Sequence, residues 1–370
     1  MDATLIAHLV KVFRSRSAPF RRAALSLCVA VAPALSLAAE DVASYRLEKT
    51  VTIPSGDTGW DYNSLDAARG HMFIAHRKAG LHVYDTRGAR VIKTLENSAG
   101  TNTSALALEF DLGIAGTTDG HVLLFRPSTL RTLSRIKSNT DGFDGATFDA
   151  VSRRFAMVGE ADETSKTTPV LFFDGRTGQW VGSVAVASMK VDAPRPDERG
   201  NILLPLRDKG TVVKIDMKAM QVAADYPLTD CLLPAALEVD TTQQRVLVGC
   251  RGKGSVTPAL VVLDAATGKQ IARLAIGRGV DEVMFDRKAS TIVTANGEDG
   301  SMTLIRQRSA DDYSVEETIG TVPMARTGVL DEHTGKIYLV AARYTTRHET
   351  GKPAVTHFVP NSFSVFTYSK

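Results

Sequence analysis

The segment Asp61-Tyr-Asn-Ser-Leu-Asp66 is repeated along the chain, and each full copy ends in an aspartate five residues after a charged or small residue. Each copy stands at the head of a half-buried strand. The further copies are Asp144-Gly-Ala-Thr-Phe-Asp149, Asp192-Ala-Pro-Arg-Pro-Asp197, Ala235-Ala-Leu-Glu-Val-Asp240, Asp281-Glu-Val-Met-Phe-Asp286, Arg326-Thr-Gly-Val-Leu-Asp331 and, in degenerate form, Ser104-Ala-Leu-Ala-Leu-Glu109.

The spacing of these copies predicts the fold. Their first residues are separated by 43, 40, 48, 43, 46 and 45 residues. A period in this range, with several short strands in each unit, is typical of a β-propeller. We therefore expect an all-β chain of seven four-stranded antiparallel blades, forming a single domain over residues 40–370. In such a ring the first residue of every innermost strand borders one central channel.

Residues 1–39 lie outside the repeat and have the features of a secretory signal peptide. Five basic residues, the last two being Arg21 and Arg22, precede an apolar run over residues 23–37, and Ser36-Leu-Ala38 supplies small residues for cleavage. This pattern predicts export to the periplasm or the medium. The apolar run is too short and too interrupted for a transmembrane span.

The charge balance of the exported chain argues against nucleic acid as a partner. After removal of the signal peptide, 39 Lys and Arg residues stand against 40 Asp and Glu residues. No basic stripe remains, whereas nucleic-acid binding requires one. We expect a monomer with no nucleic-acid partner.

The last repeat supplies only three strands, over residues 327–330, 336–341 and 362–368. The missing outer strand is available near the N-terminus, where residues 45–53 alternate as a strand does. We therefore predict that this N-terminal strand completes blade seven and closes the ring, which removes exposed sheet edges.

Several short motifs occur along the chain in a fixed order. They are Gly59-Trp-Asp-Tyr62, Phe73-Ile-Ala-His76, Cys231 with Pro234, Val246-Leu-Val-Gly-Cys-Arg251, Ile276-Gly-Arg-Gly-Val-Asp281, Ala295-Asn-Gly297 and Ala325-Arg326-Thr. In these motifs the chain resembles the YVTN-repeat, YncE-like family of exported seven-bladed propellers. The resemblance covers nearly the whole mature chain and implies the fold and the export route, but no single reaction.

The chain departs from that family at two places. Relatives often carry His-Gly where this chain has Ser104-Ala105, and acidic residues where it has Leu232-Leu233. Both changes remove polar groups from the expected channel mouth, so the ligand chemistry of the family does not transfer directly.

The aligned first positions predict a polar ring at the channel mouth, formed by Asp61, Ser104, Asp144, Asp192, Ala235, Asp281 and Arg326. The ends of the second strands should add His76, Arg77, Glu160, Arg207, Asp208, Arg251, Asn296 and Arg343 on the same face. Four carboxylates placed close together repel one another. Arg326 would compensate one of them, and a bound Ca²⁺ or Mg²⁺ would compensate the others, because hard oxygen ligands suit these ions.

A structural interpretation competes with this site at every position. Asp61, Asp144, Asp192 and Asp281 are alternatively caps that accept backbone N–H bonds from the preceding loop. His76 is alternatively a structural residue at a strand end, and Trp60 either stacks on a ligand at the mouth or packs between blades. The candidate ligand-binding set is Trp60, Asp61, His76, Asp144, Asp192, Asp281, Asn296 and Arg326.

Cys231 and Cys250 are the two cysteines beyond the signal peptide. Cys231 precedes the first strand of blade five, and Cys250 ends the neighbouring antiparallel strand on the same face. In an oxidising compartment two cysteines so placed should form a disulfide, which would hold the loops of the mouth.

Three functions remain open from the sequence. The favoured one is a binding or interaction module, with its partner on the loop face and with residues 343–360 as the most prominent loop. The second is a metal-dependent hydrolase or lyase of the propeller lactonase type, and the third is a cell-envelope scaffold. No nucleophile, zinc, haem or phosphate-loop motif is found, so a non-catalytic role is preferred and no catalytic residue is assigned.

Overall fold

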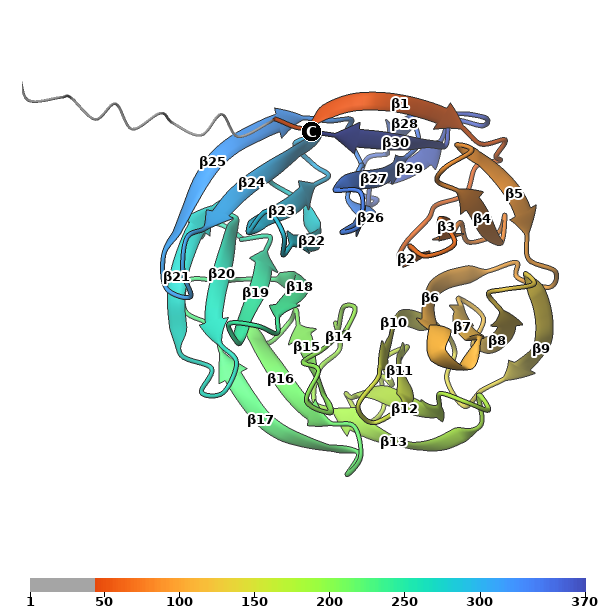
Figure 1. Ribbon diagram of the computed structural model, residues 1–370, viewed down its shortest axis with the longest axis horizontal. Coiled ribbons are helices and arrows are strands. Elements are labelled where there is room, and N and C mark those ends of the chain that lie inside the picture. The colour runs from red at the N-terminus through yellow and green to blue at the C-terminus, as the bar shows by residue number, and fades with distance from the viewer. Residues whose placement is uncertain (1–43) are drawn as a thin grey trace, which may run out of the picture. The chain divides into compact units, whose positions relative to one another are not determined.

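The structure, a computed structural model, describes residues 44–370, and the predicted signal peptide lies outside the described residues. Seven four-stranded antiparallel sheets are arranged as a ring around a central channel (Figure 1). The prediction of a seven-bladed β-propeller is confirmed. None of the described residues forms a helix long and apolar enough to cross a membrane.

The first three blades follow the chain from the channel outwards. Blade one consists of β2 (Asn63–Asp66), β3 (His71–Ala75), β4 (Leu81–Asp85) and β5 (Arg90–Thr94). Blade two consists of β6 (Thr101–Ala107), β7 (Leu112–Thr117), β8 (His121–Arg126) and β9 (Arg131–Lys137), with the 3₁₀ turn η1 (Leu108–Phe110) between its first two strands. Blade three consists of β10 (Phe143–Asp149), β11 (Arg154–Gly159), β12 (Thr168–Asp174) and β13 (Trp180–Val186).

The next three blades repeat this order. Blade four consists of β14 (Arg195–Pro196), β15 (Asn201–Leu206), β16 (Thr211–Asp216) and β17 (Gln221–Pro227). Blade five consists of β18 (Pro234–Asp240), β19 (Arg245–Cys250), β20 (Ala259–Asp264) and β21 (Gln270–Ala275). Blade six consists of β22 (Val280–Asp286), β23 (Thr291–Asn296), β24 (Ser301–Gln307) and β25 (Tyr313–Gly320).

Blade seven joins the two ends of the described chain. It consists of β26 (Thr327–Asp331), β27 (Lys336–Ala341), β30 (Ser364–Ser369) and β1 (Arg46–Thr52). β1 pairs antiparallel with β30, and Val51 lies opposite Val365. The predicted closure by the N-terminal strand is confirmed, and Figure 1 shows the first and last strands of the ring side by side.

The last aspartate of the repeated segment caps a turn. It ends the innermost strand, and its carboxylate accepts a hydrogen bond from a backbone N–H of the next turn. Arg69 N donates to Asp66 over 3.1 Å, Ser152 N to Asp149 over 2.7 Å and Thr242 N to Asp240 over 3.0 Å. The aspartate therefore recurs because each blade needs the same turn.

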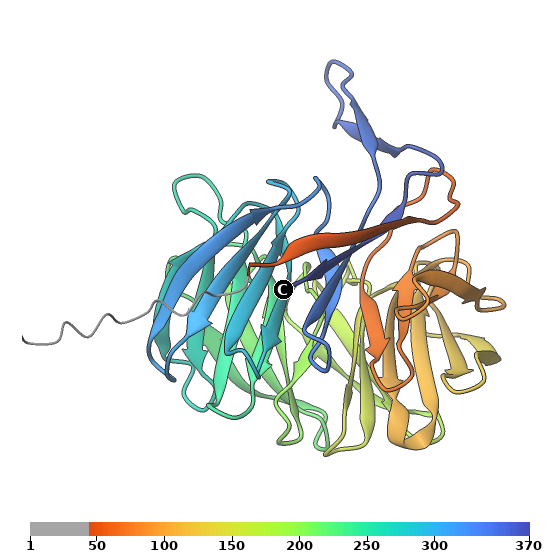
Figure 2. The same ribbon diagram turned by 45° about the horizontal axis from the view of Figure 1, so that its top comes forward.

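One further sheet stands outside the blades. β28 (Tyr344–Arg347) and β29 (Val355–Phe358) form a two-stranded hairpin between β27 and β30. Figure 2 shows that this hairpin projects beyond the ring on one face. The sequence analysis placed residues 343–360 as a long loop on this face, and the structure shows that most of that loop is a hairpin.

Candidate functional site: the mouth of the central channel

The mouth is formed where the innermost strand of each blade begins and the second strand ends. Asp61 N donates a hydrogen bond to Ala75 O over 3.0 Å, and Asp192 N donates to Pro205 O over 3.3 Å. These bonds hold the first residue of the repeated segment beside the end of the second strand. The next residues of those second strands include Arg77 and Arg207, which therefore reach the same mouth.

Three of the predicted mouth aspartates are paired with arginines. Arg77 Nη2 lies 2.9 Å from Asp61 Oδ2, and Arg207 Nη2 lies 2.6 Å from Asp192 Oδ1. Asp281 contacts Arg251, lies 3.3 Å from Arg326 Nε through Oδ2, and lies 3.6 Å from Arg207 Nη2 through Oδ1. We call the four arginines, Arg77, Arg207, Arg251 and Arg326, the arginine rim.

The fourth aspartate, Asp144, has a weaker polar environment. Its Oδ1 accepts a hydrogen bond of 3.2 Å from Asn102 Nδ2. Burial raises its pKa, although the charges of Lys190, Arg207 and Arg77 oppose that effect. The carboxylates at the mouth are thus bound by side chains, and the turn-capping role that the sequence analysis weighed for them belongs to the last residue of the repeated segment.

Burial raises the pKa values of two of the mouth carboxyls. It raises the pKa of Asp192 to about 8, against the opposing charge of Arg207, and the neighbouring Asp281 and Asp144 add to the increase. Burial likewise raises the pKa of Asp61 to about 6, although Arg326 and Arg77 oppose it. Burial therefore favours the protonated form of Asp192, although Arg207 favours the ionised one.

The arginine side chains at the mouth are more exposed to solvent than the aspartate side chains. The rim side chains are exposed by 40% at Arg77, 20% at Arg207, 23% at Arg251 and 27% at Arg326. The paired carboxylates are exposed by only 11%, 6% and 8% at Asp61, Asp192 and Asp281. The mouth was expected to be acidic, but its accessible layer is guanidinium.

A β-bulge explains why the first residue of the segment reaches the channel in three blades. The strand pairing shifts by one residue at Asp144, Ala235 and Asp281, each of which has no direct partner on the second strand. A bulge turns the unpaired residue out of the regular alternation. The repeat in the sequence shows the position of these residues but not the bulge.

Below the mouth, a second layer of charge lines the channel. Arg195 contacts Glu282 and lies 3.6 Å from Glu238, and Arg287 lies 3.7 Å from Glu238. Burial raises the pKa of Glu282 to about 7, against the charge of Arg195. Tyr62 bonds to the mouth, where its hydroxyl donates to Asp192 Oδ1 over 3.1 Å.

Sequence analysis missed this second layer. Tyr62 and Glu282 occupy the second position of the repeated segment, and Arg195 and Glu238 occupy the fourth. Side chains two residues apart on a strand face the same side, so these polar residues on innermost strands were the signal that could have identified the layer.

Three predicted site residues lie away from the mouth in buried surroundings. Trp60 packs with ring centroids 4.9 Å from Phe358 and 5.2 Å from Phe363. Asn296 is fully buried, and its amide nitrogen donates to Thr303 Oγ1 over 3.0 Å. These contacts give both residues a packing role.

His76 is the third of them. Its Nδ1 lies 3.0 Å from His82 Nε2, and its ring stacks on Phe363 with centroids 3.8 Å apart. Burial lowers the pKa of His76 to about 3, and the neighbouring His82 adds to that effect. Burial therefore favours the neutral imidazole, which packs on Phe363.

The carboxylates do not converge on a common point. Within residues 44–370, no three His, Cys, Asp or Glu side chains are grouped so that they could hold a metal ion. The sequence analysis assigned one compensating charge, Arg326, to the four aspartates, and the structure adds Arg77, Arg207 and Arg251.

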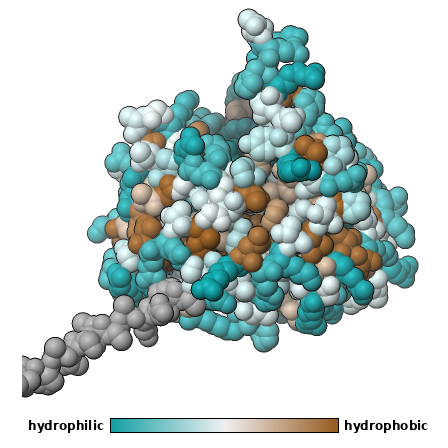
Figure 3. Space-filling view, turned by 90° about the horizontal axis from the view of Figure 1, so that it is seen from above, coloured by the Kyte–Doolittle hydropathy of each residue, from teal (hydrophilic) through white to brown (hydrophobic). Residues whose placement is uncertain are grey.

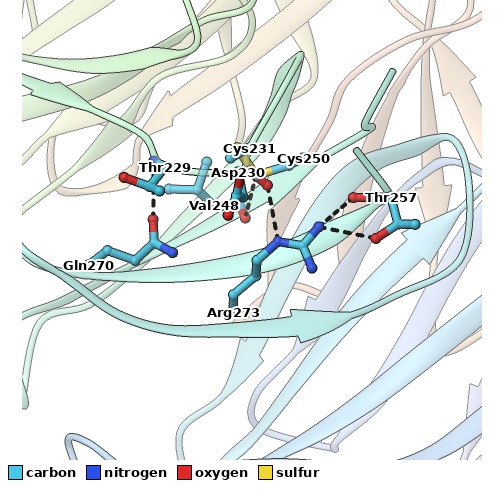
Figure 4. Close-up of a disulfide and its surroundings, with 8 residues drawn as sticks. All are labelled: Thr229, Asp230, Cys231, Val248, Cys250, Thr257, Gln270 and Arg273. Carbon is cyan, nitrogen blue, oxygen red and sulfur yellow. Dashed lines mark hydrogen bonds between the residues drawn. A yellow bond between two sulfur atoms is a disulfide. The ribbon is translucent and has the colours of Figure 1, made fainter. Parts of the chain in front are cut away.

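The predicted disulfide between Cys231 and Cys250 is present, with Cα atoms 5.4 Å apart. Figure 4 shows it beside Arg273, whose guanidinium donates to Asp230 O over 3.0 Å and to Thr257 O over 2.7 Å. These bonds tie the loop before β18 to the loop after β19. Arg251 follows Cys250 directly, so the disulfide fixes the backbone next to one rim arginine.

A separate hollow lies in the side of the ring between blades two and three. It has a volume of about 490 Å³ and an apolar lining that includes Leu124, Ile136 and Trp180. Ile136 and Trp180 are among the exposed large apolar side chains. This groove belongs to the outer strands and has no contact with the arginine rim.

No protein-family model and no curated protein matches the chain. The WD40 repeats of RRP9 are similar with a TM-score of 0.69 and 9% identity, over 88% of this chain and 100% of that one. The structure of U3-55K is similar with a TM-score of 0.67 and 9% identity, over 86% of this chain and 98% of that one. Hydrazine synthase of Kuenenia stuttgartiensis is similar with a TM-score of 0.66 and 12% identity, over 84% of this chain and 99% of that one. At these identities the likeness establishes a WD40-like β-propeller fold, while the YVTN-repeat resemblance stays an expectation.

Proposed function

We propose that this chain is an exported binding module that takes an anionic group of its ligand or partner at the arginine rim. The observation that carries the proposal is the layering of charge at the mouth. Arginine side chains that are 20–40% exposed lie over carboxylates that are 6–11% exposed. A ligand arriving from solvent therefore meets donors held in place from below.

The chemistry of the rim fits an anion. Arginine stays charged at all physiological pH values, and its planar fork matches carboxylate and phosphate groups. Burial raises the pKa of Asp192 and so favours its neutral form, which offsets the charge of Arg207 less than a carboxylate would. Asp192 thus holds Arg207 in place without fully cancelling its charge.

The export part of the proposal rests on two features. Residues 1–39 have the pattern of a cleaved signal peptide, and Cys231 and Cys250 form a disulfide, which persists in oxidising compartments.

Thermal unfolding of the mature protein with citrate or inorganic phosphate, at constant ionic strength, tests the site. A ligand at 100 times its dissociation constant stabilises the folded state by about 2.7 kcal/mol, which is several degrees in Tm. The double variant Arg207→Gln/Arg251→Gln should lose this increase. Arg287→Gln, which removes an arginine from the lower charge layer, should keep it.

The size of the increase relative to each variant's own Tm is the quantity to compare, because removing an arginine also lowers the starting stability. An equal increase in all three proteins, or none in the wild type, would contradict an anion site at the rim.

A further inference from the structure

The β28–β29 hairpin is held at its base and free along its length. Phe358 N donates to Asp57 Oδ1 over 2.8 Å, and His357 Nδ1 lies 3.0 Å from Asp57 Oδ2. The Phe358 ring packs on Trp60. All four residues of β28 are exposed. An isolated two-stranded hairpin is only marginally stable in water, so this one depends on its contacts with the ring. Asp57 and Trp60 are therefore the anchor that holds the hairpin above the ring.

One edge of this hairpin is open. In an antiparallel pair alternate residues bond across the pair, and the intervening ones point their backbone groups outward. Val359 N donates to Arg343 O, so Tyr344 and Thr346 of β28 point outward, as do Thr356 and Phe358 of β29. Asp57 occupies the outward N–H of Phe358, so the outer edge of β28 is the more accessible one.

One side of the hairpin is basic. Thr345 lies opposite His357, and Arg347 lies opposite Val355, so these four side chains share one face. Arg343, two residues before Thr345, extends the same face. Among the described residues neither Arg343 nor Arg347 takes part in an ion pair, while the one acidic residue of the turn, Glu349, is 2.8 Å from Lys352.

The base of the hairpin adjoins the arginine rim. A Cβ atom added to Gly59 would lie 3.3 Å from the Phe358 ring and 3.6 Å from the Arg77 side chain. The apolar base of the hairpin therefore lies next to Arg77 of the arginine rim. Figure 3 shows the hairpin rising from the ring with a mainly hydrophilic surface.

We propose that an extended acidic segment of a partner protein adds to β28 as a third strand, with its carboxylates facing Arg343 and Arg347. Backbone bonds to Tyr344 and Thr346 would supply the pairing, and alternate acidic side chains would fall on the basic face. This inference rests on the proposed function, since the strand would lead an anionic chain to the arginine rim.

A peptide fits this surface better than a nucleic acid does. Single-stranded nucleic acids bind where exposed aromatic rings stack with bases. Trp60 and Phe363 are buried at this site, and Tyr344 is the one exposed aromatic ring of the hairpin. The open backbone edge is useful to a peptide strand and not to a nucleotide chain.

The first measurement is fluorescence anisotropy of the mature protein with a labelled hexapeptide of alternating threonine and glutamate. Its affinity should exceed that of the glutamine-for-glutamate peptide by at least about tenfold, the factor that corresponds to 1.4 kcal/mol. A peptide with N-methylated alternate amides should also bind at least about tenfold more weakly, because it cannot donate along the edge.

Two matched proline variants then locate the edge. Thr346 and Thr356 are cross-strand partners, and both have outward N–H groups. Thr346→Pro removes one of the two outward donors of the β28 edge, and its ring obstructs a third strand, so it should weaken binding of the unmethylated peptide by at least about tenfold. Thr356→Pro removes the equivalent donor of β29 and should leave binding unchanged. Circular dichroism and Tm confirm that both variants fold.

A charge variant provides the second control. Arg343→Gln/Arg347→Gln should weaken peptide binding by at least about tenfold, whereas Lys352→Gln at the tip should not. Equal effects of the two proline variants, or an oligodeoxythymidylate that binds more tightly than the peptide and ignores Thr346→Pro, would overturn the inference.

The citrate experiment separates this inference from the proposed function. If citrate stabilises the wild type through Arg207 and Arg251 while the peptide fails, the strand addition is wrong and the rim site stands. If the peptide binds through β28 while citrate has no effect, the rim site is wrong and the docking edge stands.

Discussion

Asp192 shows how one buried carboxyl makes the stability of this protein depend on pH. Its carboxyl is 6% exposed, contacts Arg207 and accepts a hydrogen bond from the Tyr62 hydroxyl. Burial raises its pKa to about 8 in the folded state, despite Arg207. An unfolded aspartate has a pKa of about 4, so the folded protein holds a proton that the unfolded chain releases.

The pH dependence follows from that difference. A raised folded-state pKa gives stability that is complete below about pH 4 and is lost as the pH rises through about 8. We predict that the Tm of the wild type falls between pH 5 and pH 9, and that Asp192→Asn reduces this fall by at least about 3 °C. Calorimetry at five pH values checks it.

Asp119→Asn is the control for this experiment. Although desolvation acts the other way, hydrogen bonds from Thr117, His121 and Arg135 lower the pKa of Asp119. The stability that Asp119 contributes is therefore lost only in acid. Asp119→Asn should leave the fall in Tm from pH 5 to pH 9 unchanged. Parallel curves for wild type and Asp192→Asn would show that Asp192 does not carry the effect.

At the scale of the element, β1 acts through its two ends. Its own residues are mostly exposed because it is the outer strand of blade seven. Tyr45 and Ile53, which flank it, are 1% and 3% exposed and belong to the core cluster that also contains Val365 and Tyr368. The strand thus contributes backbone pairing along its length and apolar packing at each end.

We predict that Tyr45→Ala lowers the free energy of unfolding by about 3 kcal/mol, because it removes a buried aromatic ring from the core. Leu47→Ala, at a position that is 51% exposed, should change it by less than about 0.5 kcal/mol. Urea unfolding followed by fluorescence measures both. Similar losses in the two variants would mean that β1 is not anchored as described.

Elements were predictable to the extent that they follow the repeat. The period identified the seven blades and the closing strand, since every blade except blade two reuses the same turn aspartate. The β28–β29 hairpin lies outside the repeat, so nothing in the period distinguished it from an irregular loop. The position of the aspartates at the mouth was likewise predictable, but their partners were not, because bulges and the ends of second strands decide which arginine each one meets.

At the scale of the whole molecule, the channel is filled by alternating charge. Arginines alternate with carboxylates in the rim, in the aspartates below it and in the Arg195–Glu282 layer. We predict that removing divalent cations with a chelator and then adding Ca²⁺ or Mg²⁺ changes the Tm by less than about 1 °C, well below the several degrees expected of a ligand near saturation.

The same experiment tests the hypothesis that a divalent cation binds at the mouth. A Tm increase with Ca²⁺ or Mg²⁺ that disappears in Asp144→Ala/Asp281→Ala would establish a metal site at the mouth.

The pairing of β1 with β30 has a consequence for the order in which the protein is made. Thr52 and Ser364, which are hydrogen-bonded neighbours, are separated by 312 positions in the chain. During synthesis β1 emerges first and has no partner until β30 is complete. A chain that ended before residue 364 would therefore carry two unpaired strand edges, at β1 and β27. We expect such a chain to be cleaved more readily by proteases than the full-length protein.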